Sequence, residues 1–201
     1  MTGPLQVAQH LEQGLLLSIS LPVTDASRQL EQSQHGFAVL IDKTQPQTLV
    51  QRSDLAGLLN DEHHLLFEFL HQFPPLVLLD VDDRIAMLDH DILKFILLLL
   101  ERLKASGLIV YRDQRVKGII SLDTLIDALP LSALPPSSTT NRDGLPGNLV
   151  TQTRVYICHT CEKQDPPAPV CIPREGDVPD CPKHWSHGPM KLFKSEESEN
   201  Y

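Results

Sequence analysis

The stretch GLIVYRDQRVKGIISLDTLIDAL, residues 107–129, contains the local signals on which the fold prediction depends. Gly107–Asp113 and Arg115–Ser121 are apolar runs separated by a short polar segment, a pattern that predicts a β-hairpin. Leu122–Leu129 follows with apolar residues at helical spacing, directly after Ser121, a residue type that caps helix N-termini well. The stretch therefore predicts strand, strand and helix, in that order.

The same order of elements is predicted earlier in the chain. HGFAVLID (residues 35–42) and QTLVQ (residues 47–51) have the composition of buried strands. SDLAGLL (residues 53–59) then predicts a helix capped by Ser53 or Asp54. The chain thus contains two imperfect copies of one pattern.

Each copy is extended upstream by one more strand and one more helix. In the first copy these are LLLSISLP (residues 15–22) and the helix that begins near Thr24. In the second copy they are RIAML (residues 84–88) and DILKFILLLLERLKAS (residues 91–106). Both copies therefore follow the order strand, helix, strand, strand, helix, which predicts an α/β (α+β) fold in which each copy covers the apolar face of the other.

The stretches HGFAVLID…TLVQRSDLAGLL and SGLIVYRDQRVKGIISLDTLIDAL resemble a tandem pair of CBS domains, the module named after cystathionine β-synthase. The resemblance covers about residues 5–130, with copies at about 5–60 and 76–130 inside a body of residues 1–130. It implies a pseudo-twofold regulatory module that associates as a homodimer. It also implies a cleft between the copies that can bind an adenine nucleotide.

The same resemblance suggests which residues would hold the ribose of that nucleotide. Carried over by position, the first copy offers Gln51 and Asp54, and the second copy offers Ser121 and Thr124. Each copy keeps half of the expected pair, since Asp54 lacks a hydroxyl partner and Ser121 lacks a carboxylate partner. The alternative is that Asp54 and Ser121 are simply helix caps and turn residues.

All four cysteines of the chain lie near its C-terminus, between residues 158 and 181. Cys158-x2-Cys161 and Cys181-x2-His184 form two short pairs with the spacing of zinc ligands. Residues 154–193 resemble a zinc ribbon, in which two such turns and a few short strands surround one ion. A unit of this size cannot build a sufficient core, so a structural Zn²⁺ would supply its stability.

The fourth zinc ligand is left open by the sequence, because Cys171 or His187 could take the place of His184. Two disulfides or four free thiols are further alternatives. Four or five candidate ligands compete for four positions, which favours a closed structural site over a catalytic one with an open position for water.

The remaining sequence predicts connections and a broad class of function. Residues 60–90 predict an added helix from Glu62 to Gln72. Residues 131–153 predict a flexible linker, and residues 194–201 predict a disordered tail. The ribbon would therefore be tethered to the body by the linker. The net charge of −9 argues against nucleic-acid binding, and neither a signal peptide nor a membrane span is evident, which predicts a cytoplasmic protein.

No sequence motif of a nucleophile, a phosphate loop or a dinucleotide site occurs in the chain. The sequence predicts a non-enzymatic regulatory or adaptor protein with unidentified protein partners. An adenine-nucleotide sensor and a nucleic-acid-binding zinc ribbon are the alternatives.

Overall fold

The computed structural model describes most of the predicted body and C-terminal unit. The described residues are 5–58, 64–81, 87–88, 90–112, 115–128, 154–164, 167–173 and 178–193. The predicted linker and the predicted tail lie outside them.

The first copy has the predicted order of elements. Strand β2 (Leu15–Ser18) is followed by helix α1 (Val23–Gln32), strands β3 (Phe37–Asp42) and β4 (Gln45–Gln51), and helix α2 (Arg52–Ala56). β2 pairs in parallel with β3, and β3 and β4 form an antiparallel hairpin. A parallel pair needs a crossover between its strands, and α1 provides it.

The second copy repeats this arrangement with a longer crossover. Strand β5 (Val77–Asp80) pairs in parallel with β7 (Gly107–Arg112), and helix α3 (His90–Leu103) lies between them in the chain. β7 forms a hairpin with β8 (Arg115–Ser121), and α4 (Leu122–Asp127) ends the copy. The fold is therefore α/β, with two β-α-β-β-α repeats.

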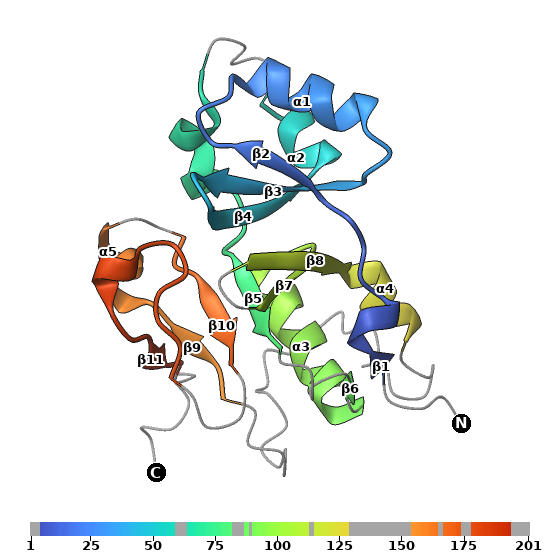
Figure 1. Cartoon of the computed structure of the whole chain (residues 1–201), viewed down its shortest axis with the longest axis vertical. Helices are drawn as coiled ribbons and strands as arrows, with labels where there is room; N and C mark the ends of the chain where they lie inside the picture. The colour runs from blue at the N-terminus through green and yellow to red at the C-terminus, as the bar shows by residue number, and fades with distance from the viewer. Residues whose placement is uncertain are drawn as a thin grey trace, which may run out of the picture.

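The two hairpins match residue by residue. The register of each hairpin shifts once, between Leu40 and Ile41 in the first copy and between Val110 and Tyr111 in the second. Each shift lies between the fourth and fifth residues of its strand, so the two hairpins have the same register. Figure 1 shows the two sheets between their helices, with β4 of the first copy facing β8 of the second.

The segment between the copies differs from the prediction. The strand that pairs with β7 is β5, and the predicted strand of residues 84–88 is wrong as its partner. Residues 84–86 lie outside the described part, and β6 (Met87–Leu88) pairs with β1 (Leu5–Gln6), which precedes the short 3₁₀ helix Val7–Gln9. The predicted helix from Glu62 is a 3₁₀ helix, η3 (Leu66–Gln72), in the described residues.

The C-terminal unit consists of short elements. These are β9 (Tyr156–Ile157), α5 (His159–Gln164), β10 (Val170–Ile172), the 3₁₀ helix η5 (Trp185–His187) and β11 (Lys191–Leu192). β9 pairs on one side with β10 and on the other with β11, and β10 also pairs in parallel with β5. The unit therefore does not hang free as the sequence suggests, because it extends the sheet of the second copy to the order β11-β9-β10-β5-β7-β8.

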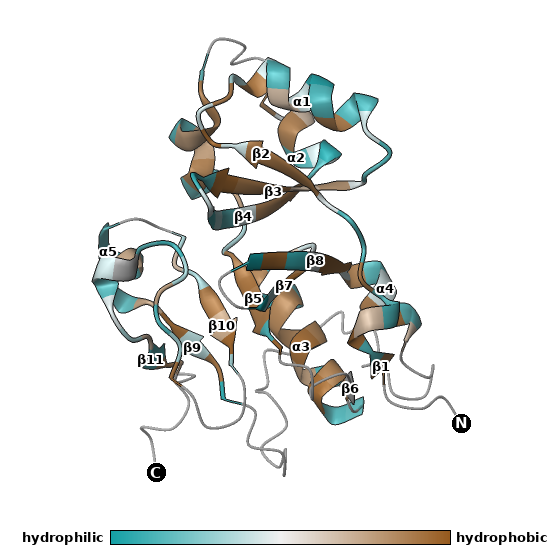
Figure 2. Ribbon diagram, in the orientation of Figure 1, coloured by the Kyte–Doolittle hydropathy of each residue, from teal (hydrophilic) through white to brown (hydrophobic). Residues whose placement is uncertain are grey.

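The hydrophobic residues form three buried clusters. One lies between the first sheet and its helices, around Leu17, Val23 and Leu30, and one lies beneath α3. The third joins the facing sheets to the C-terminal unit, and the apolar strands at these faces are visible in Figure 2. None of the described helices is long and apolar enough to cross a membrane.

Candidate functional site

Three cysteines and one histidine of the C-terminal unit converge on one point. The ligand atoms of Cys158, Cys161, Cys181 and His187 all lie within 4.8 Å of one another. His187 Nδ1 is 3.2 Å from Cys161 Sγ and 3.7 Å from Cys158 Sγ, and the sulfur atoms of Cys161 and Cys181 are 3.6 Å apart. The cysteines are buried, so the cluster is closed to solvent on that side.

The first pair is positioned by the end of β9 and the start of α5. The Cys158 N–H donates to the carbonyl of Pro169, which precedes β10, at 3.4 Å. The Cys161 N–H donates to Cys158 Sγ at 3.4 Å, so the backbone turns back on the first sulfur. A two-residue gap followed by a helical turn thus directs both thiols toward the same point.

The second pair is positioned by a closed loop. The Cys181 N–H donates to the carbonyl of Gly188 at 3.1 Å, and the His187 N–H donates to the carbonyl of His184 at 3.0 Å. Gly188 has a positive φ of 66°, a conformation that glycine adopts without strain. This loop returns the chain to Cys181 just after His187, which explains why the later histidine reaches the cysteines.

His184, the first choice from the sequence, does not belong to this group of donors in the described residues. Its ring lies against that of His187, with the centroids 4.7 Å apart. The structure therefore favours His187, the alternative ligand, over His184. Cys171 is also separate, because it lies in the middle of β10 opposite Leu78. Burial raises the pKa of the Cys171 thiol to about 12, and the nearby Asp80 carboxylate adds to the shift.

The electrostatics of the cluster suit a cation. A hydrogen bond from the Cys161 thiol lowers the pKa of the Cys181 thiol to about 5, while the same contact raises the pKa of Cys161. Thiols bind a divalent ion as thiolates, so an ion at this point would replace their protons. Sulfur ligands on tetrahedral Zn²⁺ are separated by about 3.8 Å, which follows from a bond length of about 2.3 Å. The separation of 3.6 Å between the sulfur atoms of Cys161 and Cys181 is close to that value, so the donor set fits zinc.

Lys183 lies between Cys181 and His184 in the sequence and is buried. Its side chain is only 1% exposed, and its Nζ donates to the carbonyl of Pro167 at 2.9 Å. A buried ammonium group requires such partners, since desolvation of a charge is costly. The bond joins the loop after Cys181 to the segment that leads into β10.

The four residues predicted to bind a nucleotide lie at the starts of α2 and α4. In the first copy, the Gln51 N–H donates to Asp54 Oδ2 at 2.8 Å, and the Gln51 side chain accepts from the Asp54 backbone. The two residues therefore form a capping box within the copy. The alternative interpretation of Asp54 as a helix cap describes its contacts in this structure.

In the second copy, the capping carboxylate comes from elsewhere in the chain. Glu12 Oε1 accepts hydrogen bonds from the Ser121 N–H at 3.0 Å, from the Ser121 hydroxyl, and from the Thr124 hydroxyl at 2.7 Å. Its backbone also exchanges two hydrogen bonds with Ile119. Burial raises the pKa of Glu12, but the hydrogen bonds from Ser121 and Thr124 outweigh burial and hold it below its ordinary value.

Glu12 was missed by the sequence reasoning, although one signal for it was present. Thr124 occupies the position of Asp54, so the second copy visibly lacks a carboxylate at the start of α4. Nothing in the sequence identifies Glu12 as the replacement, because it lies 109 residues from Ser121.

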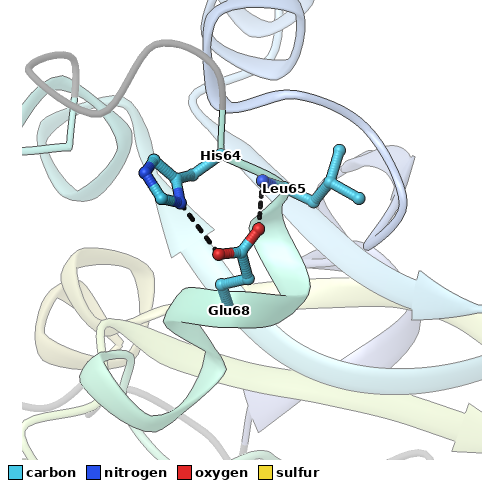
Figure 3. Close-up of polar contacts among 3 residues, drawn as sticks. All are labelled: His64, Leu65 and Glu68. Atoms are coloured by element: carbon cyan, nitrogen blue, oxygen red, sulfur yellow. Dashed lines mark hydrogen bonds and ion pairs between the residues drawn. The ribbon is translucent and has the colours of Figure 1, made fainter.

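A further polar group lies in η3, outside both sites. His64 Nδ1 is 2.8 Å from Glu68 Oε2, and the Leu65 N–H donates to Glu68 Oε1 at 3.0 Å (Figure 3). The His64 ring also contacts Phe69 edge-on, with centroids 5.9 Å apart. These contacts cap the 3₁₀ helix at the surface, so their role is structural.

Comparison with known proteins identifies similar structures but no similar sequence. No known protein family and no curated protein matches the sequence. The structure is similar to CBS-domain pair proteins, all at low sequence identity.

A CBS domain-containing protein of unknown function from Kribbella flavida is 13% identical, with a TM-score of 0.44, over 61% of this chain and 97% of that one. A CBS domain protein from Shewanella oneidensis is 14% identical, with a TM-score of 0.45, over 64% and 99%. A CBS domain pair solved with 5′-methylthioadenosine and S-adenosyl-L-methionine is 15% identical, with a TM-score of 0.45, over 61% and 97%.

Proposed function

We propose that this protein is a non-enzymatic regulatory or adaptor protein. The two repeats form its body, and the C-terminal unit is a zinc-ribbon-like module held by one structural Zn²⁺. The observation that carries the proposal is the convergence of Cys158, Cys161, Cys181 and His187 within 4.8 Å. Three thiolates and one imidazole are a common ligand set of structural zinc sites.

A structural role follows from the number of protein ligands. A catalytic zinc site keeps a position open for water, whereas here four protein donors would fill all four tetrahedral positions. The module also needs the ion, because its strands are only two or three residues long and supply little core of their own. The zinc would therefore hold the two loops together and would take no part in catalysis.

The test of the zinc site is metal content in a pair of matched variants. Elemental analysis of the purified full chain is expected to find one zinc ion, which Co²⁺ replaces to give the spectrum of a tetrahedral thiolate site. His187→Ala is expected to lose the ion or bind it far more weakly, whereas His184→Ala retains it. The opposite result would show that His184 is the ligand, and absence of zinc from the wild-type protein would refute the proposal.

The proposal includes a homodimer and an as yet unidentified protein partner in the cytoplasm. Light scattering on a size-exclusion column tests the dimer directly. Nucleic acid is not an expected ligand, because the net charge is −9 and backbone binding needs clustered Lys and Arg. Salt-sensitive binding of DNA or RNA would contradict this part and favour a nucleic-acid-binding ribbon.

A second candidate function is an adenine-nucleotide sensor, and one contact favours it. Glu12 restores a carboxylate beside the hydroxyl groups of Ser121 and Thr124, so the second copy has both groups that could bind a ribose. Thermal shift with ATP, ADP, AMP and adenosylmethionine tests the idea, with Asp54→Ala and Glu12→Ala as variants. A shift lost only in Glu12→Ala would locate the ligand at the second copy, and no shift with any nucleotide would remove this candidate.

A further inference from the structure

The cluster of Cys158, Cys161 and Cys181 is part of the core that joins the two repeats. The third hydrophobic cluster contains residues of both copies and of the C-terminal unit. The members from the first copy are Val39 and Leu49, those from the second are Leu76, Leu78, Ile109 and Ile119, and those from the unit include Tyr156, Met190 and all four cysteines. The three cysteines of the proposed metal site are therefore in packing contact with the body.

Strand β10 connects the metal ligands to the sheet of the second copy. It pairs with β5 through three residues, Val170, Cys171 and Ile172, and the Val170 N–H donates to the carbonyl of Leu76 at 2.7 Å. The carbonyl of Pro169, directly before β10, accepts from the N–H of the ligand Cys158. The first ligand pair is thus linked to β10 by a backbone hydrogen bond and by the pairing of β9 with β10.

The first repeat shows what the same sheet looks like without such a cover. Leu16 on β2 pairs with Val39, as Leu78 on β5 pairs with Ile109, so the two leucines occupy equivalent positions. Leu16 is 54% exposed, whereas Leu78 is 1% exposed beneath the C-terminal unit. β2 is also the last strand of its sheet, whereas β5 has β10 as a further neighbour, so a repeat folds without an added strand on this edge and β10 is an addition to the basic fold.

We propose that metal binding at Cys158, Cys161, Cys181 and His187 controls whether β10 stays on the β5 edge. This inference rests on the proposed zinc site. With the ion bound, the two loops are fixed and the unit covers Leu78. Without it, the short strand β10 loses its anchor, and β5 becomes an open edge like β2. The metal would therefore regulate the exposure of the β5 edge.

Hydrogen–deuterium exchange of the full chain tests this regulation. The protein with one equivalent of Zn²⁺ is compared with the same protein after chelation in a reducing buffer. Exchange at Val77–Asp80 and Val170–Ile172 is expected to accelerate about tenfold or more on chelation, while helix α1 keeps its protection. His187→Ala in the presence of zinc is expected to resemble the chelated protein, and His184→Ala the loaded one.

The outcomes separate this inference from the zinc proposal beneath it. Zinc that binds and is removed without any change at Val77–Asp80 would overturn the control of β10 and leave the zinc site intact. Loss of protection in α1 as well would also overturn it, because the ion would then hold the whole fold. Absence of zinc from the loaded sample, measured by elemental analysis, would reject the zinc site and the regulation together.

Discussion

The two repeats have the same hairpin and differ at their edges. Their strands share one register, including the shift between the fourth and fifth residues. The β5 edge of the second repeat is covered by β10, whereas β2 is the last strand of its sheet over Leu15–Ser18. The difference shows that a repeated pattern specifies the sheet, while segments outside the pattern decide which edge is buried.

The repeats also differ in how the last helix of each begins. Asp54 caps α2 from within the first repeat, and Glu12 caps α4 from the segment that leads into the first repeat. The second repeat is thus completed by the N-terminal segment and by the C-terminal unit. We expect its stability to depend on both, and the first repeat to depend more on its own residues.

The largest effect is expected at the pair of equivalent leucines. Leu78→Ala removes a buried side chain from the joint core and should cost about 2–5 kcal/mol of unfolding free energy. Leu16→Ala, at the equivalent exposed position, should cost about 0.5 kcal/mol or less. Chemical denaturation of both variants measures the difference. Equal costs would mean that Leu16 is covered in solution, for example by a second copy of the chain.

The next effect is expected where β7 begins. A Cβ on Gly107 would lie 2.6 Å from the backbone oxygen of Ile120, so part of the hairpin would have to move. Gly107→Ala should therefore cost about 1–3 kcal/mol, measured by the same denaturation. Phe37 occupies this position in the first repeat, which shows that the close approach is specific to the second. Gly36→Ala, with nothing within 4 Å of its Cβ, is the control and should be nearly neutral.

A smaller effect is expected from the two capping carboxylates. Glu12→Ala leaves three donors of Ser121 and Thr124 without their acceptor and should cost about 1–2 kcal/mol. Asp54→Ala removes a carboxylate that caps one backbone N–H and should cost about 1 kcal/mol. If Asp54→Ala proved the more costly change, the second repeat would not depend on the N-terminal segment as we infer.

The pH dependence of Glu12 provides a separate check. Its pKa is lowered in the folded state, so its contribution to stability is present above its ordinary pKa and is lost as the pH falls through the lower, folded value. Below pH of about 4.5, the unfolding free energies of the wild type and of Glu12→Gln should therefore converge. A constant gap across that range would show that hydrogen-bond geometry, and not the charge of Glu12, accounts for the effect.

The fold was predictable where local pattern and repetition agree. The hairpin of Gly107–Ser121 and the helix after it were found in the predicted places, since alternating apolar runs and an N-cap are local signals. The sequence prediction placed the first strand of the second repeat at residues 84–88, whereas the strand that pairs with β7 is β5 (Val77–Asp80). Both faces of Val77–Asp80 are buried, because Val77 and Leu79 lie in the cluster beneath α3 and Leu78 lies in the joint core. Most of the residues that cover these faces are distant in the sequence, so a local pattern did not reveal the strand.

The residues that cluster in the C-terminal unit were predictable by residue type, but only some of them by sequence number. Cysteine spacing identified Cys158, Cys161 and Cys181, because a two-residue gap directs two side chains to one point. The choice between His184 and His187 depends on the loop closed by the Cys181–Gly188 hydrogen bond, which a spacing rule does not describe. Glu12 was unpredictable for a related reason, since its partners come from the opposite end of the body.

The smallest effect is expected in the segment around η3, which lies beside the chain just after β2. The segment around η3 bonds to the chain just after β2, through the Leu66 N–H to Leu21 and the Phe67 N–H to Ile19, both at 3.0 Å. The hydrogen bond from His64 is the main cause of the lowered pKa of Glu68. His64→Ala should therefore raise the pKa of Glu68 toward its ordinary value, as read from NMR titration of its carboxyl carbon, with little change in global stability because both side chains are exposed. An unchanged pKa would mean that the Leu65 N–H alone sets it, and a large loss of global stability would show that the first repeat depends on the segment around η3.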